Sequence, residues 1–509
     1  LNRKDDMASS GKRHDFEVKY SVGFDKKGKI KGLDITLLSN AGNVCDLSAP
    51  VMSRALTHLD NCYSFKNFTA RGYICKTNTV SNTAFRGFGG PQGMLAIENI
   101  LERVSRFLGI DLDALRHENY YSLKNGIKTP YGQIVKNIKI EKIIDEMENF
   151  AGLAKRKLQV EKFNKSQINE NKPYRKGIAF MPAKFGISFN KVSLNQAGAL
   201  VHVYTDGSVR LNHGGTEMGQ GLFTKVAQVV SECFNIPIDY VHISGTNTDE
   251  VPNTSATAAS SGSDINGMAA WKAASVIKKR MLKQASKVFQ KSPSSIEFRN
   301  GLILSGNKSM TFKELAFSCW ENRVSLSSTG FYKTPKISWD QEKFKGSPYF
   351  YFTWGAAVSE AIIDIDTGES RILRADIIQD CGSSLNPLID KGQIEGGFVQ
   401  GIGWLTCEEL YFNPEGKLLT LGPSTYKIPG SRDVPPEFNI KLLENAPNEE
   451  KTIFRSKAVG EPPLLLAISH FLALKNAVSM ASEKSNADLL NAPATPSKIL
   501  AAVYNDHSM

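Results

Sequence analysis

Two kinds of hydrophobic pattern, one with a period of two residues and one with a period near 3.6, are mixed along this chain. Residues 199–204 and 209–211 are rich in alternating apolar positions and flank a turn pair at 206–207, which predicts a β-hairpin. The apolar run 361–365 leads into a second turn at 366–368 and predicts another hairpin.

Amphipathic helices are predicted between the hairpins. Apolar residues recur at three- and four-residue intervals in 97–108 and 226–233, and an alanine-rich run covers 268–289. An apolar helix is predicted from 464 to 480, directly after two prolines. Because no strand–helix unit repeats, we expect an α+β fold rather than a doubly wound parallel sheet.

The domain organisation is predicted from a shift in composition. A chain of 509 residues exceeds what one ordinary hydrophobic core organises. Residues 155–176 are rich in Lys and Asn and poor in apolar side chains, which is typical of a linker. We therefore predict a first domain in residues 1–150 and a second in 177–509.

Charge and metal-ligand spacing narrow the function classes. The formal charge is +11, but Lys and Arg occur in short groups mixed with acids, which favours a solvated face over nucleic-acid binding. The seven cysteines contain no Cys-x-x-Cys pair, and the eight histidines lack metal-ligand spacing, so we expect no metal held directly by the protein and a reducing cytoplasm. No apolar stretch approaches the ~18 residues of a membrane span.

Three loops rich in glycine or small residues precede predicted helices, at 84–93, 214–221 and 253–264. Glycine permits positive φ, and free backbone amides near a helix start attract anions. For the loop at 84–93, a phosphate-bearing ligand and a tight structural turn remain equally good explanations. Three such loops together favour a large polar ligand contacted from several sides.

A fourth motif, residues 456–463, ends in Glu461 and two prolines. Proline suits the first turn of a helix, so Glu461 is predicted at the helix N-terminus, where the dipole favours an ionised carboxylate. Such a carboxylate can act as a base near neutral pH. The alternative is that Glu461 only caps the helix.

With these motifs in their order, the chain resembles the molybdenum-binding portion of the molybdenum hydroxylases, the family of xanthine dehydrogenase and aldehyde oxidase. The resemblance is carried by residues 2–7, 81–90, the loop at Gly215, 380–387, 424–429 and 460–463. It implies two elongated mixed α/β domains with a molybdopterin cofactor bound between them. The molybdenum is then held by the pterin rather than by side chains.

The resemblance also implies roles for individual residues. Glu461 would be the catalytic base and Arg54 would orient the substrate, with Phe88 and Phe189 stacking on it. The predicted cofactor-binding residues are Ala84, Phe85, Arg86, Gly219, Gln220, Ser260, Ser261, Gly262 and Gln393. Leu47 and Leu194 match positions that line the substrate channel, and Asn190 stands where the family commonly has threonine.

The implied function is hydroxylation of purines, from hypoxanthine through xanthine to urate. Arg54 favours a purine because a fixed cation stabilises negative charge that develops on the ring. We expect FAD and two 2Fe-2S clusters on a partner chain or an upstream segment, an upstream part of the molybdenum domain, and a dimer of such assemblies. Three alternatives stay open: an aldehyde oxidase or other N-heterocycle hydroxylase with the same cofactor, a non-catalytic scaffold for partner subunits, and a basic nucleic-acid binder.

Overall fold

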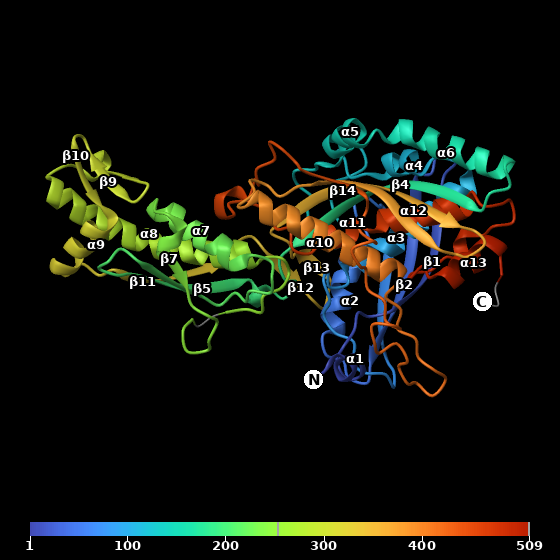
Figure 1. The fold of residues 1–509 in the computed structure, drawn as a ribbon, viewed down its shortest axis with the longest axis horizontal. Coiled ribbons are helices and arrows are strands. Elements are labelled where there is room, and N and C mark those ends of the chain that lie inside the picture. The colour runs from blue at the N-terminus through green and yellow to red at the C-terminus, as the bar shows by residue number, and fades with distance from the viewer. Residues whose placement is uncertain (252–253, 507–509) are drawn as a thin grey trace.

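The computed structural model describes residues 1–251 and 254–506, so Asn253 of the third predicted loop lies outside the described residues. Figure 1 shows an elongated molecule with two parts. We call residues 192–333 the distal lobe and the remainder the main body. Among residues 1–251 and 254–506, no helix combines the length and the hydrophobicity needed to cross a bilayer.

A four-stranded sheet forms the centre of the main body. Its order is β16 (Glu437–Leu442), β15 (Ser370–Gln379), β14 (Tyr351–Asp364) and β4 (Tyr174–Ile187), antiparallel except between β15 and β16. Alternate residues of β14 and β4 enter two different hydrophobic cores. The sheet is therefore covered on both faces.

One of these cores joins the central sheet to the first part of the chain. Here β1 (Phe16–Phe24), β2 (Ile30–Gly42) and β3 (Phe68–Lys76) form a sheet in that order. Residues of α3 (Gly90–Leu108) share a core with β2 and with β4 and β14 of the central sheet. The first 150 residues therefore pack against the central sheet rather than forming a body of their own.

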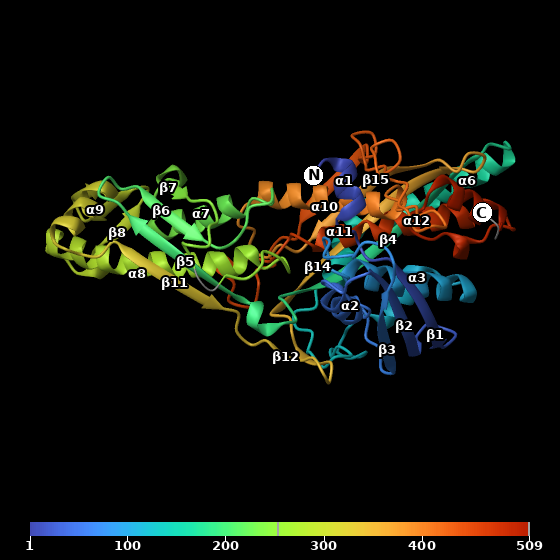
Figure 2. The ribbon, with the colours of Figure 1, turned by 90° about the horizontal axis from the view of Figure 1, so that it is seen from below.

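The distal lobe has its own core. Its sheet has the order β11 (Ser327–Lys333), β5 (Gln196–Val203), β6 (Val209–His213) and β7 (Val241–Ile243). Figure 2 shows α7 (Leu222–Phe234) and α8 (Gly262–Phe289) lying along this sheet. Helix α8 begins near the main body and runs toward the far end of the lobe (Figure 1).

The other helices are α1 (Arg3–Ser9), α2 (Ser48–Thr57), α4 (Leu112–Asn119), α5 (Ile140–Ala151), α6 (Leu153–Asn169), α9 (Phe312–Glu321), α10 (Pro387–Thr406), α11 (Pro462–Leu466), α12 (Ile468–Ser479) and α13 (Pro496–Tyr504). The remaining strands are β8 (Glu297–Arg299), β9 (Leu302–Ser305), β10 (Lys308–Thr311), β12 (Ser338–Asp340) and β13 (Lys345–Ser347). Short 3-10 turns occur at Val192–Leu194, Ile238–Tyr240, Pro293–Ser295, Ile453–Arg455 and Ala487–Leu489.

The α+β class is confirmed, and both predicted hairpins form, as β5–β6 and β14–β15. Residues 155–169 of the predicted linker lie in α6. Its Arg156 pairs with Asp376 at 2.6 Å and with Glu360 at 3.2 Å, so charged residues that suggest a linker here attach the helix to the central sheet. The helix predicted for 464–480 forms as α11 and α12.

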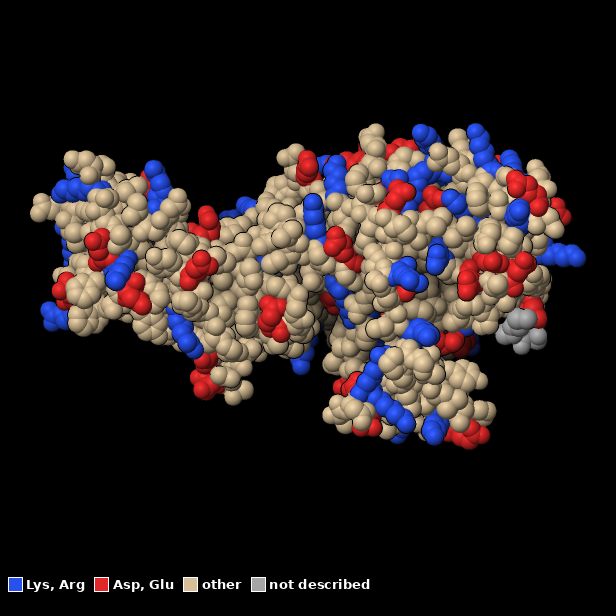
Figure 3. Space-filling model, in the orientation of Figure 1, with Lys and Arg blue, Asp and Glu red and all other residues tan. Residues whose placement is uncertain are grey.

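Basic and acidic side chains are interspersed on the face of the molecule seen in Figure 3, with no large expanse of one sign. This distribution is typical of a solvated surface. It lends no support to nucleic-acid binding on that face, where a continuous basic stripe would be expected.

Candidate functional site

A cavity of about 450 Å³ lies where the start of α8 meets α10 and the loop that carries Glu461. All four motifs singled out in the sequence contribute to its wall. The lining residues are Ala84, Phe85, Arg86, Phe88, Met218, Gln220, Leu222, Lys225, Thr257, Ala258, Ala259, Ser260, Gly262, Ser263, Asp264, Leu385, Asp390, Gln393, Ser456, Lys457, Ala458, Val459, Gly460 and Glu461. Gly219 and Ser261 are chain neighbours of lining residues.

The glycines of the first loop are explained by close packing. Gly89 has a φ of 94°, and a Cβ there would lie 2.1 Å from the carbonyl oxygen of Val51. A Cβ on Gly93 would lie 2.4 Å from the carbonyl oxygen of Ala55. Gly89 and Gly93 therefore form a tight structural turn against α2, whereas Ala84, Phe85, Arg86 and Phe88 line the cavity.

The second loop combines close packing with open space: a Cβ would lie 2.6 Å from the Leu222 side chain at Gly215 and 2.8 Å from the Ile389 side chain at Gly221. Gly219 has a φ of 93°, but a Cβ there would meet nothing within 4 Å. In the third loop, Ala259 and Ser260 both adopt positive φ, at 55° and 57°. Consecutive non-glycine residues in this region are strained, and such strain is found at ligand-binding sites.

Glu461 directly precedes α11, yet its side chain makes no capping hydrogen bond. Its backbone N–H donates to Oγ of Ser260 at 2.9 Å, and that hydroxyl donates to Oε2 of Glu461 at 3.0 Å. Oε1 accepts no hydrogen bond from the described residues. The capping alternative therefore fails, and one carboxylate oxygen is left for chemistry.

Arg86 holds this loop against α10. Its Nε donates to the carbonyl oxygen of Gly460 at 2.6 Å, and its Nη2 donates to the carbonyl oxygen of Gln393 at 3.1 Å. Nη1 donates to Oε1 of Gln400 at 3.3 Å. Burial lowers the pKa of Arg86, and the nearby Glu461 carboxylate partly opposes this shift.

The wall also contains charged residues that the motifs did not single out. Lys225 pairs with Asp390 at 2.5 Å. Asp264, 7% exposed, accepts a 2.6 Å hydrogen bond from the hydroxyl of Tyr351. Burial raises the pKa of Asp264 to about 7, opposed by the Tyr351 hydrogen bond and the charge of Lys225. Asp264 closes the third predicted loop, so its position was visible in the sequence although its role was not.

The predicted substrate residues form a second group beside the cavity. Arg54, on α2, is buried and donates to the carbonyl oxygens of Gly186 and Ser188 at 2.8 and 2.7 Å. Its guanidinium lies 5.0 Å from the ring centroid of Phe185 and 5.3 Å from that of Tyr349. These contacts fix the orientation of the guanidinium.

The other predicted substrate residues lie just before α2 or just after β4. Asn190 donates from Nδ2 to Oγ of Ser53 at 3.2 Å. Phe189 and Leu194 follow β4, and Leu47 directly precedes α2. Of the predicted substrate residues, Phe88 lines the cavity, whereas Arg54, Phe189, Asn190, Leu47 and Leu194 are not among its lining residues.

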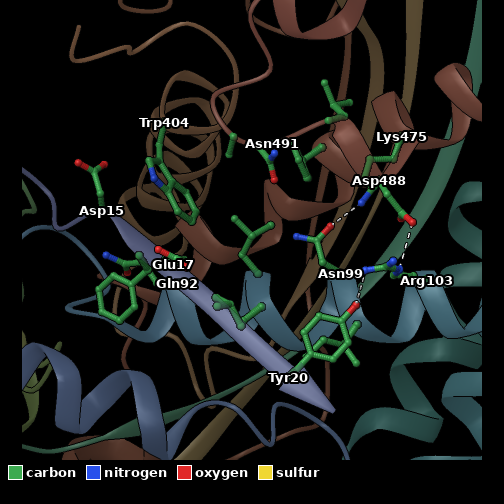
Figure 4. Close-up of a pocket in the computed structure, with 18 of the residues that line it drawn as sticks. Asp15, Glu17, Tyr20, Gln92, Asn99, Arg103, Trp404, Lys475, Asp488 and Asn491 are labelled. Atoms are coloured by element: carbon green, nitrogen blue, oxygen red, sulfur yellow. Dashed lines mark hydrogen bonds and ion pairs between the residues drawn. The ribbon is translucent and has the colours of Figure 1, made fainter. Parts of the chain in front are cut away.

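A second and larger cavity, about 550 Å³, lies elsewhere, between β1, α3 and α12 (Figure 4). In it, Arg103 contacts Tyr20 at 3.2 Å and Asp488 at 3.0 Å. Leu95, Asn99 and Ile100 of α3 also line it. None of the predicted site residues lines it, so we do not assign the chemistry to this groove.

Family models for the molybdopterin cofactor-binding domain match residues 1–120 and 146–435. The chain belongs to this family. The sequence-based identification of a molybdenum-hydroxylase portion that binds molybdopterin is thereby confirmed. Among the described residues, no group of three or more His, Cys, Asp or Glu side chains is arranged to hold a metal ion.

Curated relatives of this molybdopterin-binding chain include xanthine dehydrogenase/oxidase of Felis catus, 47% identical over 98% of the chain and 36% of the relative. Xanthine dehydrogenase of Dictyostelium discoideum is 46% identical over 98% of the chain and 35% of the relative. The chain thus spans about a third of the length of these proteins.

Solved structures share the fold. Quinoline 2-oxidoreductase from Pseudomonas putida has a TM-score of 0.83 at 19% identity, covering 99% of this chain and 64% of that one. Reconstituted CO dehydrogenase from Oligotropha carboxidovorans has a TM-score of 0.85 at 20% identity, covering 99% and 63%.

The cavity suits the cofactor that the family name implies. Its volume lies within the range of about 300–1,000 Å³ typical of small-molecule sites. Gln220, Gln393 and Ser260 line the wall with groups that can both donate and accept, and Arg86 and Lys225 place positive charge there. Within the chain, the Gln220 amide bonds to Thr216 and Met218, and the Lys225 ammonium pairs with Asp390. Open space beside Gly219 leaves room for a ligand to approach the backbone.

The raised pKa of Asp264 predicts a pH-dependent effect on stability. Because its pKa is about 7 in the fold, against an ordinary value of 3.8, the folded chain holds this proton more tightly than the unfolded chain. As pH rises from about 4 to 7, the unfolded chain releases this proton before the folded chain does, so the free energy of unfolding falls. In thermal unfolding, Asp264→Asn should raise the Tm relative to the parent more at pH 8 than at pH 4.5. The exposed Asp145→Asn is the control, and an equal change at both pH values would contradict the assignment.

Proposed function

We propose that this chain forms the cofactor-binding and substrate-oxidising part of a purine hydroxylase, an oxidoreductase of the xanthine dehydrogenase type. The observation that supports this most strongly is the Glu461 carboxylate on the wall of the cavity, held through one oxygen by Ser260 and free at the other. The identity to xanthine dehydrogenases over 98% of the chain supports the substrate class.

When bound, the molybdopterin cofactor supplies the two-electron oxidation that ring hydroxylation requires. The protein's own residues supply the acid–base chemistry and the geometry. Glu461 takes a proton, at Oε1, from the water-derived hydroxyl group that attacks the ring carbon. The Ser260 hydroxyl holds Oε2 and so keeps the carboxylate directed along the cavity wall. Phe88 offers an aromatic face against which a flat heterocycle can stack.

Arg54 is proposed to orient the purine. Two carbonyl oxygens and two aromatic rings fix its guanidinium, so little reorganisation is needed when a purine oxygen binds to its remaining N–H groups. As negative charge develops on the ring during attack, this cation stabilises it. Phe189, Leu47 and Leu194 would complete the substrate channel, with Asn190 at its edge.

The closest competing function is oxidation of an aldehyde or another N-heterocycle by the same cofactor. Asn190 supports it, because its carboxamide is directed to Ser53 and one buried carboxamide oxygen has no hydrogen-bond partner among the described residues. A different edge of the pocket could select a different substrate. The scaffold alternative is less well supported, because Ser260 bonds to the Glu461 carboxylate and Arg86 bonds to the carbonyl oxygen of the adjacent Gly460.

The proposed partners follow from the electron balance and from the relatives. Two electrons removed from the purine need an acceptor, which we assign to FAD and two 2Fe-2S clusters on the additional polypeptide that the much longer relatives possess. The outer edge of β1 is unpaired among the described strands and borders the groove in Figure 4, which supports further polypeptide docking there. We further propose a dimer of such assemblies in the cytoplasm, where its free cysteines would stay reduced.

Replacing Glu461 by Gln tests the base. Gln keeps an oxygen that can accept the Ser260 hydrogen bond but cannot accept the proton, so turnover of hypoxanthine should fall by about three orders of magnitude. Molybdenum content should stay at the parent level, because the cavity wall is unchanged. The measurement is steady-state kcat together with metal analysis of the same preparation. Activity above a tenth of the parent would remove Glu461 from this role.

Arg54→Met tests the substrate class, with Arg54→Lys as the charge-retaining control. We expect kcat/KM for hypoxanthine to fall about a hundredfold, because the cation that stabilises ring charge is lost. Oxidation of an aromatic aldehyde should fall less than tenfold, since it develops no charge on a purine ring. Equal losses on both substrates would show that Arg54 acts through packing alone and would favour the aldehyde alternative.

The assembly is tested by metal analysis of the native complex that copurifies with this chain. Molybdenum near one per chain together with about four iron atoms is expected for one cofactor and two 2Fe-2S clusters. Absence of both metals from an intact complex would favour the scaffold alternative.

A further inference from the structure

The segment that carries Glu461 is held in place by contacts from outside its own chain neighbourhood. The N–H of Ala458 donates to the hydroxyl oxygen of Tyr351 at 2.9 Å. Tyr351 is the first residue of β14, more than 100 residues earlier in the chain. A backbone amide that is satisfied by a phenol rather than by a helix or strand depends on one side chain for its position.

The direction of the Tyr351 hydrogen bonds is fixed. Its oxygen accepts from Ala458, and its O–H therefore donates to Oδ2 of Asp264 at 2.6 Å. All three residues are buried, at 6%, 8% and 7% exposure. In such surroundings a hydrogen bond to a carboxylate is strong, and leaving any member unpaired is costly.

The contacts of Glu461 and of Tyr351 both lead to the start of α8. Asp264 lies in the first turn of α8, four residues after Ser260, which contacts Glu461 directly. We call Glu461, Ser260, Asp264, Tyr351 and Ala458 the Glu461 network. One side of the network joins Ser260 to the carboxylate, and the other runs through Asp264 and Tyr351 to Ala458. Both sides start from the same end of α8.

We propose that Tyr351 and Asp264 are positioning residues for Glu461, which fix the 458–461 segment at two points relative to the start of α8. This proposal rests on the proposed function of Glu461 as the base. Ser260 holds the carboxylate and Arg86 holds the carbonyl oxygen of Gly460, whereas Tyr351 and Asp264 add a further restraint on the backbone at Ala458. An error of about 1 Å in such a group can cost a hundredfold in rate.

The test compares Tyr351→Phe with a matched control in the intact enzyme complex. Phenylalanine keeps the ring in place but removes both hydrogen bonds of the hydroxyl. The control is Tyr121→Phe, which removes an equally buried hydroxyl that donates to Asp60 at 2.6 Å, in the core that α3 shares with the central sheet and away from the cavity. The readouts are hydrogen exchange of the peptide containing Ala458, molybdenum content, and kcat and KM for hypoxanthine.

For Tyr351→Phe we expect exchange at Ala458 at least tenfold faster, kcat at least tenfold lower, and KM and molybdenum content within twofold of the parent. Tyr121→Phe should leave exchange at Ala458 and kcat within twofold. Asp264→Ala should resemble Tyr351→Phe, and Asp264→Asn should recover part of the loss because it keeps an oxygen that Tyr351 can donate to.

Three outcomes would overturn the proposal: unchanged exchange at Ala458, faster exchange with unchanged kcat, or a fall in kcat that only follows loss of molybdenum. Failure of the proposed function gives a different result. In that case the parent complex itself lacks molybdenum and purine turnover, while exchange at Ala458 still reports whether Tyr351 and Asp264 hold this segment.

Discussion

The burial of strand β14 on both faces is the constraint on which the site depends. Its alternate residues enter two separate cores, so the strand cannot shift without disturbing both. Its first residues fix the loop that leads to Glu461: Tyr351 holds Ala458, and the carbonyl oxygen of Phe352 accepts a hydrogen bond from Lys457 at 3.1 Å. The segment that carries Glu461, the proposed base, is therefore attached to a strand that is buried on both faces.

Buried ion pairs extend this constraint around the cavity. Lys457 pairs with Asp380 at 2.6 Å, and the exposed fractions of their side chains are 2% and 0%. Lys225 pairs with Asp390, which also accepts the Ser384 hydroxyl at 2.6 Å. Desolvation of two charges offsets most of their mutual attraction, so such pairs contribute little net stability. Their directional contacts instead specify one arrangement of the loops. A cavity lined by several loops depends on such an arrangement.

The sequence predicted those features that local patterns encode. The hairpins around the turns at 206–207 and 366–368 follow from the apolar runs beside them, and the loops at 84–93 and 214–221 follow from their glycines. Within the predicted linker at 155–176, composition could not show that Arg156 has buried partners more than 200 residues away.

Two residues of the site, Tyr351 and Lys225, were not predicted, because their partners too are distant in the sequence. Tyr351 lies in an apolar strand with no motif around it, and Lys225 lies within an amphipathic helix. Each gains its meaning only from residues brought beside it by the fold: Asp264 and Ala458 for Tyr351, and Asp390 for Lys225. Pairings over such separations leave no periodicity in a single sequence.

The third loop contains strained backbone at the residue that contacts Glu461. Positive φ at Ala259 and Ser260 costs roughly 1–3 kcal/mol per residue, a cost that glycine would avoid. At Ser260, however, glycine would remove the hydroxyl that accepts from the Glu461 amide and donates to its carboxylate. Only a short side chain with both a donor and an acceptor meets that requirement, so the strain at Ser260 accompanies a contact that fixes the Glu461 carboxylate. The loop is thus less stable locally than a glycine-containing loop would be, but it fixes the position of the Glu461 carboxylate.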